Sequence, residues 1–131
     1  KISNSIKKKI MEKTAFISEQ IGDNSEFVIV KLNRNVLGGD EALELTNLVN
    51  EQISQNVKYV IIDVNDVEFM NSTGLGMLAN AHTILSKNGS NLFLISVPEK
   101  ITKLLKMTHL DRVFQIFNSI DDILVKYKLK I

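Results

Sequence analysis

Apolar residues in this chain form short runs of strand length that are separated by stretches with helical spacing. Phe27–Leu32, Tyr59–Asp63 and residues 92–95 are apolar runs of the length expected for buried strands. Residues 15–21 alternate more loosely, which predicts an edge strand, and a polar turn cluster joins it to the next strand as a hairpin. A last strand is predicted over residues 113–117.

Helical spacing follows each of the later strands. Asp40 is expected to open a helix that ends near residue 55, since a negative charge is favourable at a helix N-terminus. A second helix is predicted after the Asn71–Ser72 pair and runs to about residue 87, a short third one begins at Pro98, and Ser119 caps the last. The first of these helices is expected to turn its glutamates toward solvent: Glu41, Glu44 and Glu51.

The predicted order of elements is β-β-α-β-α-β-α-β-α, and it indicates the fold class. Strands that alternate with helices favour a mostly parallel sheet with right-handed crossovers, and the hairpin adds an antiparallel edge. We therefore predict one small α/β domain over residues 14–131, with a mixed, mostly parallel sheet flanked by helices. The basic residues 1–13 are expected to form a tail or linker ahead of it.

Composition excludes several classes of function. The chain has 131 residues, 44% of them hydrophobic, a net charge of +1 and no cysteine. Disulfides, thiolate chemistry and cysteine-based zinc sites are therefore excluded, and bulk charge does not favour direct binding of nucleic acid. No apolar run approaches the roughly 18 residues of a membrane span. We expect a cytoplasmic protein that needs no metal and no cofactor.

The stretch over residues 70–78 is the most informative part of the sequence, because it lies between a predicted strand and a predicted helix. Asn71 and Ser72 are both favoured N-cap types, since their side-chain oxygens accept hydrogen bonds from free backbone N–H groups. Gly74 and Gly76 fall in the first helical turns, where each costs the helix roughly 1 kcal/mol relative to alanine. We expect them to give a partner access to Ser72, and the positive helix end suits a phosphate there.

The same residues resemble a known family. Residues 69–76, Phe-Met-Asn-Ser-Thr-Gly-Leu-Gly, follow a strand that ends in Asp63, and they resemble the signature of the STAS domain, named for sulfate transporters and anti-sigma-factor antagonists. The resemblance covers residues 14–127 and is greatest to the small bacterial anti-anti-sigma factors. Their motif usually reads Asp-Ser-Ser/Thr-Gly-Leu-Gly, and the serine after the aspartate is phosphorylated. That serine corresponds to Ser72, while Asn71 stands where the family usually has Asp and so lacks its negative charge.

The resemblance implies a regulatory binding module that is not an enzyme. Unmodified, the domain would bind an anti-sigma factor that is also a serine kinase, and so release the sigma factor. The kinase, with ATP bound to itself, would phosphorylate Ser72 or, less readily, Thr73, and a phosphatase would reverse this. Because the carboxyl ends of parallel strands meet at one rim, the partner-facing residues are expected to be Asn71, Ser72, Thr73, Gly74, Leu75, Gly76, Asn35 and Ser96.

Two alternatives remain at this point. The chain could be a non-switching scaffold or interaction subunit of a stress-signalling complex or a transporter. The more remote alternative is a serine hydrolase, but Ser72 is flanked by Met70 and Gly74 and does not match the Gly-x-Ser-x-Gly nucleophile motif. His82 lies about 15 Å further along the same helix, and only His109 is left as another histidine base.

Overall fold

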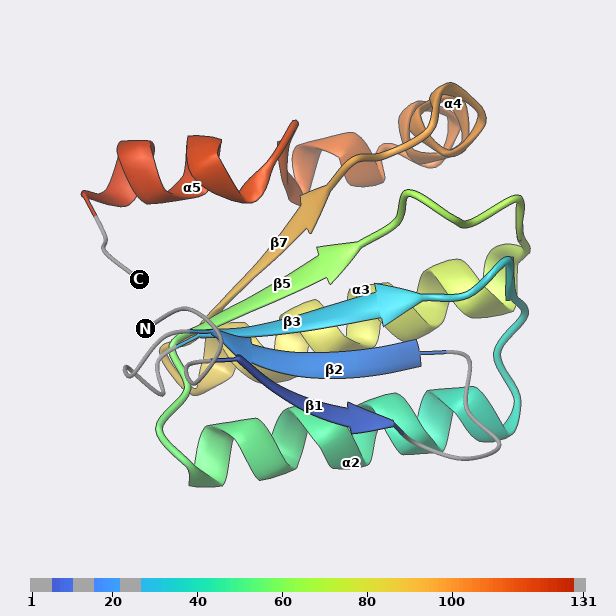
Figure 1. The fold of residues 1–131 in the computed structure, drawn as a ribbon. Coiled ribbons are helices and arrows are strands. Elements are labelled where there is room, and N and C mark those ends of the chain that lie inside the picture. The colour runs from blue at the N-terminus through green and yellow to red at the C-terminus, as the bar shows by residue number, and fades with distance from the viewer. Residues whose placement is uncertain (1–5, 11–15, 22–26, 129–131) are drawn as a thin grey trace.

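The central feature of the fold is a mixed sheet, whose strands lie side by side across the middle of Figure 1. The computed structural model describes residues 6–10, 16–21 and 27–128, with side chains from residue 27 onward. Within these residues the sheet has six strands in the order β1-β2-β3-β5-β7-β8. The strands β3, β5, β7 and β8 are parallel, whereas β1 and β2 add an antiparallel edge. Their bounds are β1 Ile6–Ile10, β2 Phe16–Ile21, β3 Phe27–Leu32, β5 Tyr59–Asp63, β7 Asn91–Ile95 and β8 Gln115–Phe117.

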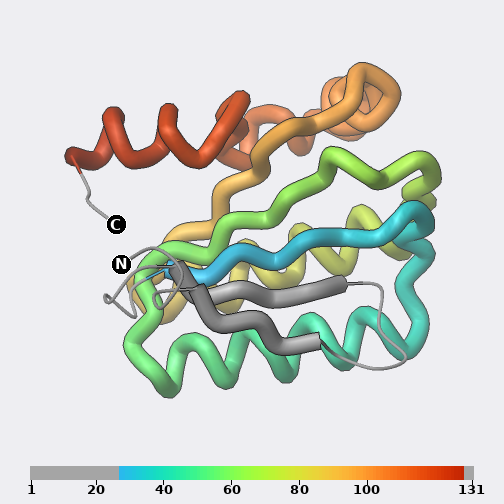
Figure 2. Tube along the Cα trace, viewed as in Figure 1, coloured from blue at the N-terminus to red at the C-terminus, as the bar shows by residue number. Residues whose placement is uncertain are grey.

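Helices cover both faces of this sheet. The long helices α2 and α3 lie on one face and α5 on the other, and the path of the chain between them can be followed in Figure 2. Ser119 caps α5 as predicted, since its hydroxyl accepts a hydrogen bond from the Asp122 N–H at 3.4 Å. The helical segments are α2 Asp40–Ser54, α3 Ser72–Lys87, α4 Glu99–Met107, the short 3-10 turn η1 Leu110–Arg112, and α5 Ile120–Tyr127.

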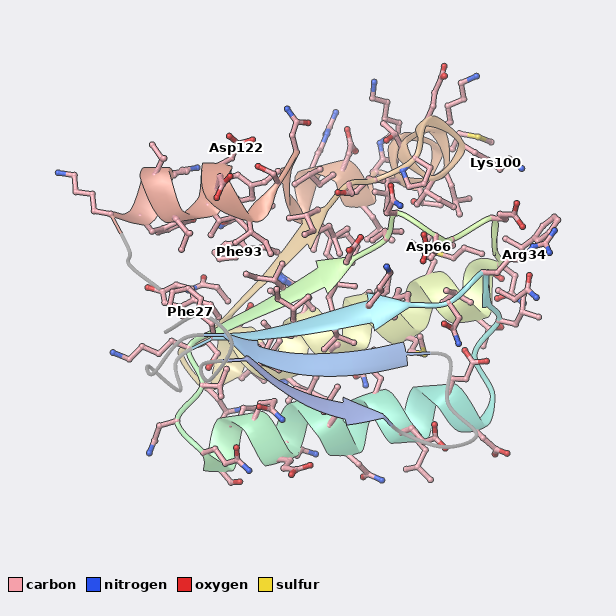
Figure 3. The ribbon with its side chains drawn as sticks, in the orientation of Figure 1. Phe27, Arg34, Asp66, Phe93, Lys100 and Asp122 are labelled. Carbon is pink, nitrogen blue, oxygen red and sulfur yellow. The ribbon has the colours of Figure 1, made fainter. Side chains whose placement is uncertain are left out.

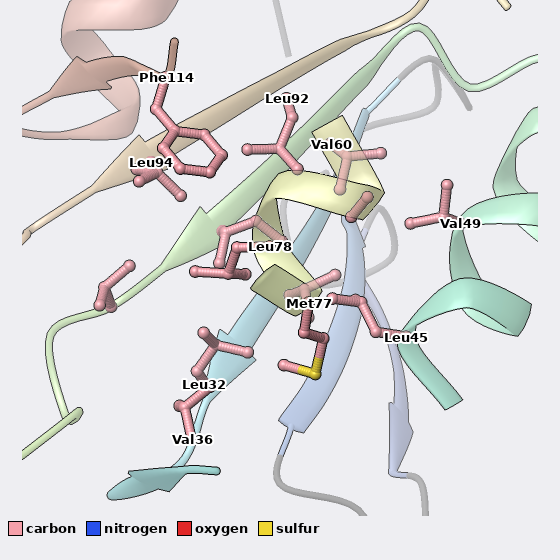
Figure 4. Packing of buried hydrophobic residues seen from close by; sticks show 14 of the residues in the cluster. Leu32, Val36, Leu45, Val49, Val60, Met77, Leu78, Leu92, Leu94 and Phe114 are labelled. Carbon is pink, nitrogen blue, oxygen red and sulfur yellow. The ribbon is translucent and has the colours of Figure 1, made fainter. Parts of the chain in front are cut away.

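The core follows from the alternation of side chains along the strands. In β3, Val28 and Val30 pack into the cluster beneath α2 and α3, while Phe27 and Ile29 pack into the cluster beneath α5. Figure 4 shows the first cluster, in which Leu78 of α3 faces residues of the sheet and Met77 lies toward Leu45 of α2. Burial of each such side chain contributes about 1.5–3 kcal/mol, so the sheet and α3 hold each other in place.

These elements confirm the predicted fold class and most of its order, but the N-terminal part differs. We expected residues 1–13 to be a tail or linker, yet Ile6–Ile10 is the strand β1, antiparallel to β2. β2 is therefore not the edge strand that we predicted. The register pairs Ile6 with Ile21 and Ile10 with Ile17, so isoleucines stand opposite each other at both ends. The three lysines between them are typical of an edge strand that resists pairing with other chains.

Several short elements also differ from the predictions. Two-residue strands β4 (Asn35–Val36) and β6 (Phe69–Met70) pair with each other, and neither strand was predicted from the sequence. Such short strands have no periodic pattern by which the sequence could reveal them. Pro98 is the N-cap of α4 and not its first residue, and the last strand begins at Gln115, after η1.

The first turns of α2 are oriented differently from the prediction. Glu41 and Glu44 are half-buried, and each has a buried carboxylate oxygen without a hydrogen-bond partner among the described residues. Burial raises the pKa of the Glu41 carboxyl above 4.5, and the nearby charge of Glu44 raises it further. Glu51 is half-buried too, whereas Leu43 is 64% exposed. The reason is helical spacing, because positions 41 and 44 lie one turn before the buried Leu45 and Leu48.

Candidate functional site

The candidate site is the N-terminal end of α3, residues 71–76, which we call the α3 tip. Asn71 has extended backbone angles (φ −98°, ψ −179°) and is the N-cap. Its side-chain Oδ1 accepts a hydrogen bond from the Gly74 N–H at 2.8 Å, and its carbonyl oxygen accepts one from the Leu75 N–H at 2.9 Å. Of the two predicted N-cap candidates, Asn71 is therefore the cap, and Ser72 is the first residue of the helix.

The six residues of the tip divide into an exposed and a buried set. Asn71, Ser72, Thr73 and Gly76 are exposed, while Gly74 and Leu75 are buried. The two hydroxyl groups thus lie at the surface. The buried pair holds the first turn against the domain, so a partner on this surface would not reach the Leu75 side chain, which is only 4% exposed.

Glycine is required at position 74 for a structural reason, and not to give a partner access to Ser72 as we predicted. A Cβ atom at this position would collide with the carbonyl oxygen of Val36 and lie 2.7 Å from its carbonyl carbon. Only glycine lets α3 approach the backbone of β4 so closely. Gly76 is the opposite case: the residue is exposed, and among the described residues no atom beyond its own stretch of helix lies within 4 Å of where a Cβ would stand. Access to the tip therefore remains a prediction for Gly76 alone.

The loop over residues 33–39 borders the tip. Asn35 pairs with Phe69 and Val36 with Met70 in the parallel β4–β6 ladder, and Asn35 is exposed there. Gly38 has a positive φ of 85°, and a Cβ on it would collide with the methyl group of Thr73. The loop and the tip are thus packed together, which agrees with the expectation that Asn35 lies beside the site.

Ser96 lies at the carboxyl end of β7, but its contacts lead elsewhere. The residue is half-buried with a positive φ of 55°, and its hydroxyl donates to the carbonyl oxygen of Asn118 at 3.3 Å. That hydrogen bond ties Ser96 to the segment between β8 and α5. The interactions that the structure gives for Ser96 therefore do not join it to the α3 tip.

The electrostatic surroundings of the tip are mild. The first turn of α3 contains no acidic residue, so the partial positive charge of the helix end is not offset within that turn. Nearby charges are paired at the surface: Arg34 with Glu68, and Lys31 with Asp66 at 3.4 Å. Figure 3 shows Arg34 and Asp66 near the carboxyl ends of β3 and β5. Exposed pairs of this kind contribute little energy, and the N-terminal end of α3 adds a partial positive charge beside Ser72.

The histidines do not form a catalytic arrangement with Ser72 in the part of the chain that the structure describes. His82 is half-buried, packs edge-on against Phe114 with 5.8 Å between ring centroids, and has a buried Nδ1 atom without a partner among the described residues. His109 is exposed at a positive φ of 62°, just after α4. Among residues 6–10, 16–21 and 27–128 there is no group of three or more metal-binding side chains. No helix there is long and apolar enough to cross a bilayer.

One surface feature next to the tip was missed from the sequence. Phe69 of β6 and Met107 of α4 are 55% and 79% exposed, and both line a groove of about 310 Å³ between these elements. The phenylalanine directly before the Met-Asn-Ser motif could have indicated an apolar surface beside the tip. The groove itself could not be foreseen, because the α4 residues that line it are more than 30 residues away in sequence.

Comparisons with known proteins give the same fold. The sequence profile of the STAS domain matches residues 3–123. A Thermotoga maritima protein, provisionally named an anti-sigma factor antagonist, is 31% identical over 67 residues, which cover 51% of this chain and 59% of that protein. The match thus spans less than two thirds of that relative's length.

Two solved structures show the likeness in three dimensions. A sulfate transporter family protein from Wolinella succinogenes has a TM-score of 0.69 at 21% identity, over 79% of this chain and 85% of that one. The Bacillus cell fate determinant SpoIIAA in its phosphorylated form has a TM-score of 0.61 at 13% identity, over 93% of this chain and 97% of that one. At these identities the likeness establishes the architecture.

Proposed function

The chain belongs to the STAS domain family, and we propose that it is an anti-sigma factor antagonist that binds an anti-sigma factor through the α3 tip. The observation that carries the proposal is that Ser72 is exposed and is the first residue of α3, directly after the N-cap Asn71. The related Thermotoga protein has the same provisional name. Binding would withhold the anti-sigma factor from its sigma factor in the cytoplasm. The domain itself would do no chemistry and hold no cofactor.

We further propose that the anti-sigma factor is a serine kinase that switches binding off at Ser72. A phosphoryl group adds about −1.5 to −2 charges at neutral pH, which disrupts a docked surface by repulsion and desolvation. The N-terminus of α3 would stabilise this group, so the fold need not change. A protein with this fold, SpoIIAA, was solved in a phosphorylated form. ATP would be bound by the kinase, Thr73 is a weaker acceptor, and a phosphatase would restore binding.

Asn71 is compatible with this switch. It keeps the cap through its hydrogen bond to Gly74, and it places no negative charge beside Ser72. An aspartate in its place would repel a neighbouring phosphoryl group. The absence of that charge therefore favours the phosphorylated state, even though a kinase that recognises the aspartate would bind less well.

A second candidate function is a non-switching scaffold or interaction subunit. Asn71 also supports it, because a kinase that recognises an aspartate at this position would bind this chain less well and so phosphorylate it less readily. The likeness to a sulfate transporter family protein supports it as well, since this architecture also occurs outside sigma-factor regulation.

The decisive experiment mixes the protein with each anti-sigma factor kinase of the same genome and with ATP, and reads the intact mass. We expect one phosphoryl group on the wild-type chain and on Thr73→Ala, and none on Ser72→Ala. A kinase that binds but transfers no phosphate would support the scaffold. Failure of every anti-sigma factor to bind would refute the antagonist function. Hydrolysis of model esters that is lost in Ser72→Ala would instead establish a hydrolase.

A further inference from the structure

The groove between β6 and α4 is a second feature of the surface around the tip. We call it the β6–α4 groove; its volume is about 310 Å³. It continues directly from the site in sequence, because Phe69 and Met70 are followed by Asn71 and Ser72. Its walls are formed by apolar side chains with lysines at the rim: Phe69, Met70, Leu104, Met107, Lys100 and Lys103.

The apolar part of this groove is unusually open. Phe69 is 55% exposed and Met107 is 79% exposed, and both belong to one continuous lining with the half-buried Met70 and Leu104. Single exposed apolar residues are common, but apolar residues that share a concave surface mark interaction sites. Methionine side chains adapt to different partners, and aromatic residues are typical anchors of interfaces.

The rim of the groove is positive. The Lys100 ammonium lies over the Phe69 ring, 5.4 Å from its centroid, and both residues line the groove. The exposed Lys103 ammonium lies 3.8 Å from the Glu99 carboxylate, which is at the distance limit of an ion pair and is itself exposed. Glu68, the acidic residue of the lining, is paired with Arg34 and so contributes little net charge. Figure 3 shows Lys100 on α4 above this end of the sheet. A matching ligand is apolar at its centre and acidic at its edges.

We infer that the β6–α4 groove binds an acidic amphipathic helix of the same partner protein that docks on the α3 tip. A helix fits better than an added strand, because β6 has only two residues and already pairs with β4. Side-chain packing must therefore supply the affinity, as it does when an amphipathic helix inserts apolar residues into a groove. This inference rests on the proposed function in that the partner is taken to be the anti-sigma factor.

The first test uses a phage-displayed library of helical peptides and the whole chain as target. We expect enriched peptides to carry apolar residues at positions i, i+3 or i+4, and i+7 with acidic residues beside them. Their affinity should fall at least about tenfold in Met107→Asp, the loss expected for an interface anchor. Lys103→Glu should weaken them too, and replacing the peptide's glutamates by lysines should restore binding to that variant.

Val125→Asp is the matched control. Val125 is 78% exposed and, like Met107, lies in the last turn of its helix, but on α5. The same new charge thus enters the last turn of a helix away from the groove, and circular dichroism checks that both variants fold. Basic or uncharged peptides, no enrichment, or equal losses in Met107→Asp and Val125→Asp would overturn the inference.

The second test separates this inference from the proposed function. An anti-sigma factor that binds the wild-type chain should bind Met107→Asp at least about tenfold more weakly and Val125→Asp unchanged. Equal binding to both variants would refute the groove as its docking site while the antagonist function stands. Peptides that bind the groove when no anti-sigma factor binds the chain would support an acidic-helix site and refute the antagonist function.

Discussion

The contact between α3 and β4 leads to a test with two glycines of the same helical turn. Gly74 and Gly76 are both in α3, so replacement by alanine makes the same chemical change in nearly the same backbone. The surroundings differ completely. The new methyl group of Gly74→Ala meets the carbonyl of Val36, whereas that of Gly76→Ala points into open space.

The magnitudes follow from this difference. Alanine stabilises a helix by about 0.5–1 kcal/mol relative to glycine, and this gain applies to both positions. Gly74→Ala must also relieve the collision with Val36, and overpacking of this kind costs about 1–3 kcal/mol. The Val36 carbonyl cannot simply rotate away, because it also accepts a hydrogen bond from the Asn71 N–H at 3.4 Å. The helix gain cancels between the two variants, so Gly74→Ala should be less stable than Gly76→Ala by about 1–3 kcal/mol.

Urea unfolding followed by circular dichroism measures this difference directly. Gly76→Ala should unfold at a higher urea concentration than the wild-type chain, and Gly74→Ala at a lower one than Gly76→Ala. Equal stability of the two variants would refute the reasoning, because it would mean that α3 does not approach β4 as closely as the structure shows.

Three further predictions concern the cap, a buried carboxylate and access to the tip. Asn71→Ala should lower the free energy of unfolding by about 1 kcal/mol in urea titrations, whereas Asn71→Asp, which keeps the capping oxygen and adds a favourable charge, should not. Because the pKa of Glu41 is raised in the native state, its ionisation costs stability as the pH rises through that pKa. Glu41→Gln should therefore raise the melting temperature at pH 7, and this gain should vanish below the ordinary value of 4.5; an equal gain at both pH values would contradict the argument. Gly76→Ala should weaken binding of the anti-sigma factor in calorimetry although it stabilises the fold, and unchanged affinity would show that the partner does not approach this residue.

Much of the fold was predictable because it depends on local patterns. The apolar run Tyr59–Asp63 has the length of a buried strand, and it is β5 with the same bounds. The α3 helix and its cap were predictable since Asn71 supplies the capping oxygen within three residues of its donor. β1 was not, because its lysines resemble a solvated tail and its stability depends on pairing with β2.

The candidate site was only partly predictable for the same reason. The exposure of Ser72 follows from its place at a helix start, and the structure agrees. The role of Gly74 could not be predicted, because it depends on the Val36 carbonyl, which packs against Gly74 only in the folded chain. The β6–α4 groove also depends on tertiary structure, because Phe69 and Met107 are far apart in sequence and line the same groove only in the folded chain.

The central claim is that another protein docks on the α3 tip and that a negative charge at Ser72 prevents this binding. A titration of the anti-sigma factor tests the claim most directly. Isothermal calorimetry should give similar dissociation constants for the wild-type chain and Ser72→Ala. Ser72→Glu, which adds a negative charge at the same surface, should bind at least about tenfold more weakly. Equal affinity of Ser72→Glu and Ser72→Ala for an anti-sigma factor that binds the wild-type chain would contradict the account.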